Sequence, residues 1–321
     1  MKLFPLHLVP NDTNINFMRL RWISLGVALL LAVGAIAAMA VNGFNYALDF
    51  TGGTVVELRF QQPTEVDGVR DRLAAAGYES AQVQTFGSGS DLLVRLQPHE
   101  GKVDAETNNR TAQQVLKAAS LPDNTAKIMR NEFVGPQVGK ELALNGLYAL
   151  IFVVVGFLIY IGFRFEWKFA VAAIFTTLHD VLIVAGFFAL TGREFDLTVL
   201  AGLLSVMGFS INDTIVVFDR VRENFRSLRA DPVEILNRSV NQTLSRTIIT
   251  SFVAFLTVLA LYIYGGGSLE GMAIAQMMGI VIGTISSIFI ACPLLTMGFL
   301  TVTKQDLMPK AKEEAALARR P

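Results

Sequence analysis

Six long apolar runs constrain the fold of this sequence more than any other feature. A helix that crosses the hydrocarbon core of a membrane needs about 20 consecutive, mostly apolar residues, and each run is close to this length. The predicted spans are 22–41, 142–163, 169–190, 197–218, 247–264 and 271–300. We therefore expect a polytopic α-helical membrane protein with six transmembrane helices. Pro293 is expected to kink the last and longest of them.

The composition supports this reading and excludes several functions. Charged residues make up 17% of the chain and the mean hydropathy is +0.48, whereas soluble domains carry about 25% charge. The 27 basic and 27 acidic residues balance, unlike the basic surplus of a nucleic-acid-binding protein. A single cysteine, Cys292, excludes an internal disulfide and a multi-cysteine zinc site. No phosphate-binding loop is present, so we expect neither enzymatic activity nor a cofactor or metal.

The first apolar run has a second interpretation. Arg19 and Arg21 precede it, and the triplet 38–40 resembles the small-residue cleavage site of a signal peptide. The run is longer than the apolar region of a usual signal peptide, and its N-terminal lead is long. A transmembrane helix is therefore the favoured interpretation.

The distribution of Lys and Arg predicts the orientation in the membrane. These residues gather in the tail 1–21, in the link between the second and third spans, in the basic link 219–246 and in the tail 301–321. The two short links on the other side offer only Arg193. Because cytoplasmic loops carry the basic excess, both termini are expected in the cytoplasm. Segment 42–141 is then exported as a domain.

The pattern of segment 42–141 predicts a ferredoxin-like α+β domain. Strands are expected at 54–60, 81–86, 91–96 and 126–133, and helices at 64–76 and 104–119. The order β-α-β-β-α-β is that of the ferredoxin-like split motif. No arrangement typical of a catalytic site occurs in this segment.

Asp213 is the leading functional candidate, because ionisable residues at membrane depth are costly. It lies within the fourth span, and at about 100° per residue Gly202, Ser205, Asn212 and Asp213 are expected to share one helix face. Such a face suits close contact with another helix. The carboxyl could take up and release protons, or it could form a structural hydrogen bond between helices.

A second acid, Asp180, lies near the middle of the third span beside His179. Histidine titrates near neutral pH, so the two residues could extend a proton path. They could equally be a satisfied contact between helices.

Arg246 opens the fifth span near the cytoplasmic end that Asp213 also approaches. It could pair with Asp213, or its guanidinium could extend to the membrane interface as an anchor. Gly279, Gly283 and Ser287 recur every four residues in the sixth span, which indicates a helix-packing face. The basic link 219–246 is expected to be an amphipathic surface segment that contacts anionic lipid or a cytoplasmic partner.

Four motifs resemble those of the SecD/SecF family. ALDFTGGT at 47–54 and VGPQVG at 134–139 are similar to the motifs that open and close its outer domain. FSINDTIVVFDRVREN at 209–224 and NQTLSRT at 241–247 are similar to its fourth-span and fifth-span signatures. The match covers about residues 40–300, and the Asn-Asp form with one modest outer domain resembles the SecF branch.

The resemblance implies a function. SecF proteins belong to the resistance–nodulation–division superfamily and, with SecD, assist the SecYEG channel and the SecA motor in exporting preproteins across the bacterial inner membrane. YajC and YidC are further implied partners. The family is thought to use the proton gradient to move its outer domains, and its fourth-span Asp and fifth-span Arg are implicated in proton passage. These correspond to Asp213 and Arg246.

Two other functions stay open on the sequence. A small-molecule exporter of the same superfamily would usually carry larger outer domains on a twelve-helix chain. A passive assembly scaffold would need the helix bundle and its packing faces, but not the buried acid.

Overall fold

The computed structural model describes residues 13–86, 89–96 and 105–307, so His7, His99, Gly87 and Ser88 lie outside the described residues. The chain divides into two compact units. One contains the N-terminal part through Asn45 together with the chain from Leu150 onward, and the other runs from Tyr46 to Ala149.

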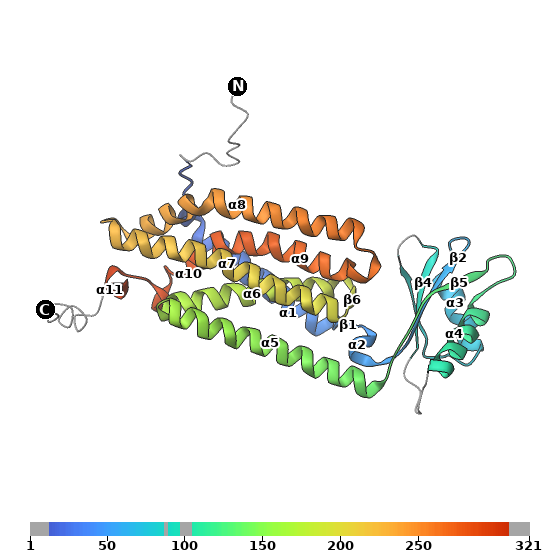
Figure 1. The fold of residues 1–321 in the computed structure, drawn as a ribbon. Helices are drawn as coiled ribbons and strands as arrows, with labels where there is room; N and C mark the ends of the chain where they lie inside the picture. The colour runs from blue at the N-terminus through green and yellow to red at the C-terminus, as the bar shows by residue number, and fades with distance from the viewer. Residues whose placement is uncertain (1–12, 87–88, 97–104, 308–321) are drawn as a thin grey trace, which may run out of the picture. The chain divides into compact units, whose positions relative to one another are not determined.

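The first unit is a bundle of long helices, and six helices of the chain are long and apolar enough to cross a membrane (Figure 1). Its core is α7, which packs against α6, α8 and α9, while α1 packs against α6. The long helices are α1 (Arg21–Asn42), α5 (Pro136–Arg164), α6 (Trp167–Thr191), α7 (Leu197–Ser227), α8 (Pro232–Tyr264) and α9 (Gly267–Ser286). Shorter elements are η1 (Phe17–Leu20), β1 (Asn45–Tyr46), β6 (Glu194–Phe195), the π-helical η2 (Ser287–Ala291), α10 (Cys292–Leu294), η3 (Gly298–Leu300) and α11 (Lys304–Leu307).

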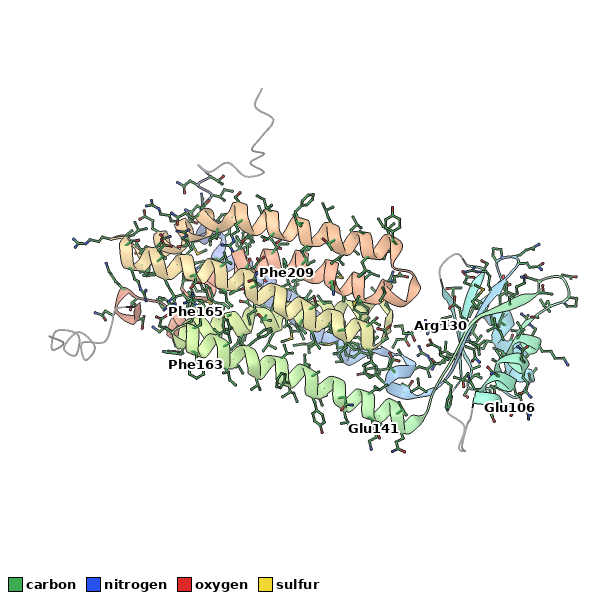
Figure 2. The ribbon with its side chains drawn as sticks, in the orientation of Figure 1. Glu106, Arg130, Glu141, Phe163, Phe165 and Phe209 are labelled. Atoms are coloured by element: carbon green, nitrogen blue, oxygen red, sulfur yellow. The ribbon has the colours of Figure 1, made fainter. Side chains whose placement is uncertain are left out.

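The long helices differ sharply in the fraction of their apolar stretch that the rest of the chain buries. About half of the apolar stretch is buried in α6, α7 and the α9 span, against 11% in α1, 6% in α5 and 17% in α8. At the end of α5 Phe163 is 90% exposed, while Phe165, just after the helix, is buried; both residues are labelled in Figure 2. The bare apolar surfaces of α1, α5 and α8 are available to lipid or to neighbouring helices.

The structure corrects the prediction of a separate link at 219–246. Helix α7 continues to Ser227 and α8 begins at Pro232, so only residues 228–231 connect them. Asp231 caps α8, because its carboxylate accepts a hydrogen bond from Val233 N at 2.9 Å. The apolar side chains of Phe218, Val221 and Phe225 recur at helical spacing. The many arginines of this stretch led to its prediction as a link, although this spacing indicates a helix.

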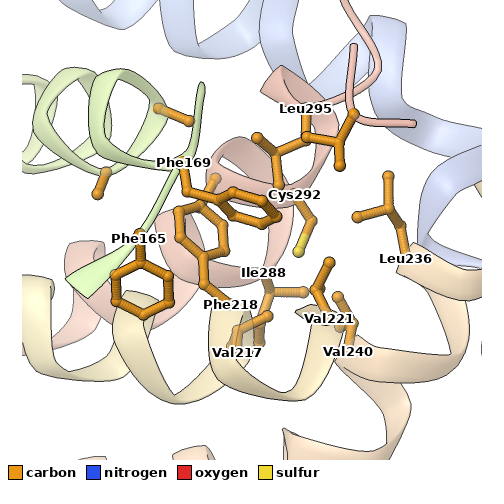
Figure 3. Close-up of a cluster of buried hydrophobic side chains, with 14 of the residues drawn as sticks. Phe165, Phe169, Val217, Phe218, Val221, Leu236, Val240, Ile288, Cys292 and Leu295 are labelled. Carbon is orange, nitrogen blue, oxygen red and sulfur yellow. The ribbon is translucent and has the colours of Figure 1, made fainter. Parts of the chain in front are cut away.

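These helical extensions enclose an apolar cluster at one end of the bundle. Phe165, Phe169 and Phe218 lie close together, and the Phe169 and Phe218 ring centroids are 5.1 Å apart (Figure 3). Cys292 is fully buried among the same side chains, where a free cysteine acts as a small apolar side chain. The cluster joins α5, α6, α7, α8 and η2, and therefore fixes their ends relative to one another.

Two further spans also have boundaries that differ from the predicted ones. Helix α5 begins at Pro136, earlier than the predicted residue 142. The last span ends at Leu294 instead of 300, and hydrogen bonding of π type occupies Ser287–Ala291 just before Pro293. Proline lacks a backbone N–H and cannot sustain a regular helix through this point.

The second unit has the ferredoxin-like order of elements. They are β2 (Gly53–Phe60), α3 (Val66–Ala75), β3 (Gln82–Phe86), β4 (Asp91–Leu96), α4 (Ala105–Ala119) and β5 (Ala126–Val134), with a short α2 (Leu48–Thr51) before them. The antiparallel sheet has the order β3-β4-β2-β5. In the register of β2 and β4, Val56 pairs with Val94 and Leu58 with Leu92. All four side chains are buried in a core that α3 and α4 complete.

Candidate functional site

Asp213 lies inside the bundle, where three helices meet. Its side chain belongs to α7 and the residue is 2% exposed. Ser251 Oγ of α8 lies 3.3 Å from Asp213 Oδ2, and the same hydroxyl lies 2.7 Å from Thr247 O of its own helix. Thr284 of α9 donates in turn to Ser251 Oγ at 2.7 Å. A carboxyl with one long hydrogen bond is thus held in the centre of a helix bundle, where its charge is poorly compensated.

Arg246 does not form a direct ion pair with Asp213. Among the described residues no nitrogen of Arg246 lies within ion-pair distance of a carboxylate, and the residue is exposed. The two charges still attract each other over a longer distance. Of the two interpretations of the sequence, the geometry favours an exposed guanidinium over a direct pair with Asp213.

The predicted shared face of α7 is in fact two faces. Gly202 and Asp213 are buried, whereas Ser205 and Asn212 are exposed. Positions 205 and 212 are about two turns apart and lie on one stripe, while Asn212 and Asp213 are neighbours and point about 100° apart. Asn212 therefore does not join Asp213 in the interior.

The small residues of α9 allow close contact with α7. A Cβ atom at Gly279 would overlap the side chain of Val206, and one at Gly202 would lie 3.1 Å from Met272 O. At Gly283 an added Cβ would lie 3.3 Å from Ser210 Cβ. The backbones approach this closely because no side chain separates them.

His179 and Asp180 form a second polar centre in the bundle, on α6. Asp180 is fully buried, and its Oδ2 accepts hydrogen bonds from Ser210 Oγ and Ser286 Oγ, each at 2.6 Å. His179 Nδ1 lies 3.3 Å from Asp180 Oδ1, and Nε2 lies 3.2 Å from Ala28 O of α1. Asp180 and Asp213 thus occupy separate sites that face different sets of helices.

The hydroxyl residues around both acids are the functional candidates that the sequence analysis did not identify. Ser210 and Ser286 donate to Asp180, Ser251 contacts Asp213, and Thr284 donates to the hydroxyl of Ser251. Each is a polar residue within an apolar span, which is a weak signal because such hydroxyls usually bond to their own helix. Only the packing of α6, α7, α8 and α9 brings them to the acids.

At the basic end of the bundle several basic side chains are paired with acids. Arg164 contacts Asp219 at 2.8 Å, and Arg222 contacts Glu166 at 3.2 Å. Lys168 bonds to Asp306 at 2.9 Å. Hydrogen bonds from Lys168 and Thr303 outweigh the desolvation of the partly exposed Asp306 carboxyl, and they lower its pKa. These contacts tie the ends of α5 and α7 together and the start of α6 to α11.

A glycine junction lies at the beginning of the sheet in the second unit. Gly52 and Gly53 have φ values of 70° and 120°, which side-chain-bearing residues rarely adopt. A Cβ at Gly139, in the first turns of α5, would lie 2.9 Å from Gly52 N. The two sequence motifs that flank the domain therefore meet backbone to backbone. In the described part of the chain, no group of three or more His, Cys, Asp or Glu is arranged to hold a metal ion.

Comparisons with known proteins agree with this architecture. A model of the C-terminal part of the protein export membrane proteins SecD/SecF matches residues 114–299, and a model of the SecD/SecF GG motif matches residues 37–64. The second range contains the glycine pair at the junction. The first contains both acidic sites.

Individual relatives extend the match over nearly the whole chain. The chain is 44% identical over 309 residues to the protein translocase subunit SecF of Escherichia coli O157:H7, covering 95% of this chain and 94% of that one. It is 48% identical over 296 residues to SecF of Pseudomonas aeruginosa, covering 92% and 94%.

The fold agrees with a solved structure. In the crystal structure of SecDF, a translocon-associated membrane protein from Thermus thermophilus, the matching part has 39% identity and a TM-score of 0.81. The match covers 91% of this chain but 39% of the longer SecDF chain. On the family models and the extent of these matches, the chain belongs to the SecF family of protein translocase subunits.

Proposed function

We propose that this chain is an accessory subunit of the Sec protein translocase, which works with SecD and uses the proton gradient to promote preprotein export. The names of its relatives support the role in translocation. Association with SecD is supported by relatives in which both parts form one chain, such as SecDF of Brucella abortus, 41% identical over 90% of this chain. SecYEG, SecA, YajC and YidC are proposed as further partners. No cofactor or covalent reaction is part of the proposal.

The buried carboxyl of Asp213 carries the proposal for proton coupling. An ionised carboxylate at this depth is costly unless it is compensated, and its compensation is one long hydrogen bond from Ser251 and the distant charge of Arg246. Binding a proton removes this cost and also removes the attraction to Arg246. The protonated and ionised forms therefore favour different arrangements of α7 and α8.

The energy available from the gradient matches such a change. One proton crossing a membrane potential of 100 mV releases about 2.3 kcal/mol. This is enough to shift a two-state equilibrium about fiftyfold, since each 1.4 kcal/mol is a factor of 10. We propose that this shift biases the outer unit, residues 46–149, between two states that engage and release the emerging preprotein.

The exposed polar stripe of α7 supports a membrane partner. Ser205 and Asn212 are exposed on a helix that lies at membrane depth, where contact with lipid is unfavourable for an amide. A neighbouring transmembrane helix would satisfy them by hydrogen bonding. We propose that SecD supplies this helix. Exchange of Asn212 for Leu should weaken co-purification with SecD, while Leu147→Ala on the exposed face of α5 should not.

We also propose that the chain resides in the bacterial inner membrane with both termini in the cytoplasm. The paired arginines at the end of α5 and α7 support this orientation through the positive-inside rule. In a Cys292→Ser background, Ser227→Cys should react with a membrane-impermeant thiol reagent in inside-out vesicles and stay protected in intact spheroplasts. The opposite pattern would reverse the orientation.

The test of function is Asp213→Asn in translocase vesicles. We expect the gradient-dependent part of preprotein export to be lost, because an amide cannot exchange a proton, while assembly with SecD is retained. Asp219→Asn is the matched control, since it makes the same change on the same helix at a carboxyl that is 41% exposed. Equal, undiminished export by both variants would refute proton coupling through Asp213 and support a passive scaffold instead.

A further inference from the structure

A cavity of about 500 Å³ lies at the basic end of the bundle, between the end of α5 and the last turns of α7. A volume of this size is typical of a site for a small ligand. The side chains around it come from one residue of α5 and from one stripe of α7, in which residues three or four positions apart are neighbours. They are Arg164, Asp219, Arg222, Glu223, Arg226 and Ser227.

Two of these arginines are held in place by contacts with the chain. The guanidinium carbons of Arg164 and Arg222 lie 5.3 Å and 5.1 Å from the ring centroid of Phe165, which is buried. Both distances suit a cation–π contact. Arg222 also donates a hydrogen bond from Nη1 to the backbone oxygen of Arg164 at 3.1 Å. Because a guanidinium that is already ordered loses little freedom on binding, this arrangement favours a ligand with oxygen acceptors.

The charge that remains around the cavity is positive. Three ion pairs form there: Arg164 with Asp219, Arg222 with Glu166 and Arg220 with Glu223. Arg226 is exposed, and within the described residues no acidic oxygen lies at ion-pair distance from it. Four arginines against three acids leave one positive charge. Arg226 follows Arg222 by four residues, and like charges at this spacing repel each other, so an anion between them would be stabilising.

The cavity lies at the depth of the lipid headgroups. Phe163 and Trp167 are exposed on either side of Arg164 in the chain, and exposed tryptophan is typical of the membrane–water interface. Helix α7 has 31 residues, or about 46 Å at 1.5 Å per residue. A bilayer with its headgroups is about 40–45 Å thick, so the last turns of α7 reach headgroup level. The anions nearest to Arg226 in a membrane are therefore lipid phosphates.

An exposed apolar surface leads from the cavity into the membrane. Tyr160 precedes Arg164 by four residues on α5, so the two share one face of the helix, and Phe163 is next to them. Both aromatic side chains are exposed, and the chain buries only 6% of the apolar stretch of α5. A lipid whose headgroup lies in the cavity can place an acyl chain along α5, a contact that a free phosphate ion lacks.

We propose that the cavity binds the phosphodiester of one anionic phospholipid, with Arg226 and Arg164 as the principal donors. Arg164 uses a single nitrogen, Nη2, in its hydrogen bond to Asp219. A guanidinium offers five N–H donors in a planar fork that matches phosphate oxygens, so both arginines have donors to spare. The single negative charge of phosphatidylglycerol equals the one unpaired positive charge. The inference does not depend on proton coupling through Asp213.

Native mass spectrometry of the purified full chain in mixed micelles with phosphatidylglycerol tests the site by counting retained lipid. Arg226→Gln should lower the affinity for phosphatidylglycerol about tenfold, the value of a lost hydrogen bond to a charged group. It breaks no ion pair of the described residues, so the fold should be unaffected. The matched control is Arg229→Gln, the same change at an exposed arginine that does not line the cavity. Equal losses in both variants would indicate general attraction to anionic lipid and overturn the site.

A change of opposite sign separates binding from folding. The side chain of Glu223 is 64% exposed in its pair with Arg220, and exposed pairs of this kind contribute little to stability. Glu223→Gln leaves two unpaired positive charges at the cavity and should raise the affinity for phosphatidylglycerol about fivefold. Weaker or unchanged binding would overturn the role of charge in the site.

Two further probes identify the source of the phosphate. Phosphatidylethanolamine carries the same phosphodiester with a compensating ammonium group, so its retention should be about fivefold weaker. Excess inorganic phosphate should not displace phosphatidylglycerol, because it makes no contact with α5. Equal retention of the two lipids would overturn the requirement for a net negative charge. Displacement by inorganic phosphate would assign the cavity to a free anion and overturn the lipid site.

Discussion

The contact between α7 and α9 allows the packing argument to be tested by exchanging volume across it. A Cβ atom added at Gly279 would overlap both γ-methyl groups of Val206, a side chain that is 1% exposed. The side chain of Val206 is branched at Cβ, so it has little rotamer freedom with which to move away. Gly279→Ala must therefore separate the helices.

The expected cost follows from the size of this overlap. Inserting one methyl group into a close-packed interior costs about 1–3 kcal/mol. Val206→Ala removes the two nearest carbons and leaves Cβ of residue 206, 2.8 Å from the added methyl group, so in that background we expect Gly279→Ala to cost less than it does beside the valine side chain. The coupling energy between the two positions should then be about 0.5–3 kcal/mol in favour of the double variant.

Reversible unfolding of the purified protein in mixed micelles measures these differences in free energy. Gly156→Ala is the control for the glycine substitution itself, because a Cβ there would meet no atom within 4 Å. It should leave the free energy of unfolding unchanged or raise it by about 0.5–1 kcal/mol, since alanine favours helix more than glycine. If Gly279→Ala costs as much with Ala at 206 as with Val, the close approach of α7 and α9 is wrong.

Two further predictions concern the ends of the two units. Because Gly53 has a φ of 120°, Gly53→Ala should cost about 1–3 kcal/mol in backbone strain, seen as a lower melting temperature, whereas Gly135→Ala, with open space at its Cβ, should not. The folded-state pKa of Asp306 is lowered by its bonds to Lys168 and Thr303, so its stabilising effect is complete above the unfolded pKa of about 3.9 and disappears as the pH falls through the folded value. The difference in unfolding free energy between the native chain and Asp306→Asn should thus be constant from pH 6 to 8 and vanish towards pH 2; a difference that grows on acidification would contradict the sign.

The sequence predicted the secondary structure well where a strong periodic signal was present. The six spans follow from the length of apolar helix that a bilayer requires. The strand 91–96 coincides with β4, and the split order of strands and helices is the one found. The charged stretch 219–246 was misjudged, because buried residues such as Phe225 and Leu236 are separated by arginines that face outward.

The candidate site was predictable in its ionisable members but not in its geometry. Asp213 and Asp180 stand out because few acids occur in apolar spans, and any packing would have to accommodate them. Whether Arg246 touches Asp213 could not be inferred, because a long side chain at a helix end can turn inward or outward. Asn212 was placed with Asp213 although neighbouring helical residues point about 100° apart.

The sequence by itself thus determined which segments lie in lipid and which in water, the family motifs and the identity of the buried acids. It could do so because hydropathy and residue type are local properties. Tertiary structure alone decided which hydroxyls reach those acids. Ser251 and Thr284 meet at Asp213, and Ser286 reaches Asp180, because α8 and α9 pack against α6 and α7 at one particular depth and rotation. A shift of one residue along any of these helices would turn its hydroxyl by about 100° and remove the contact.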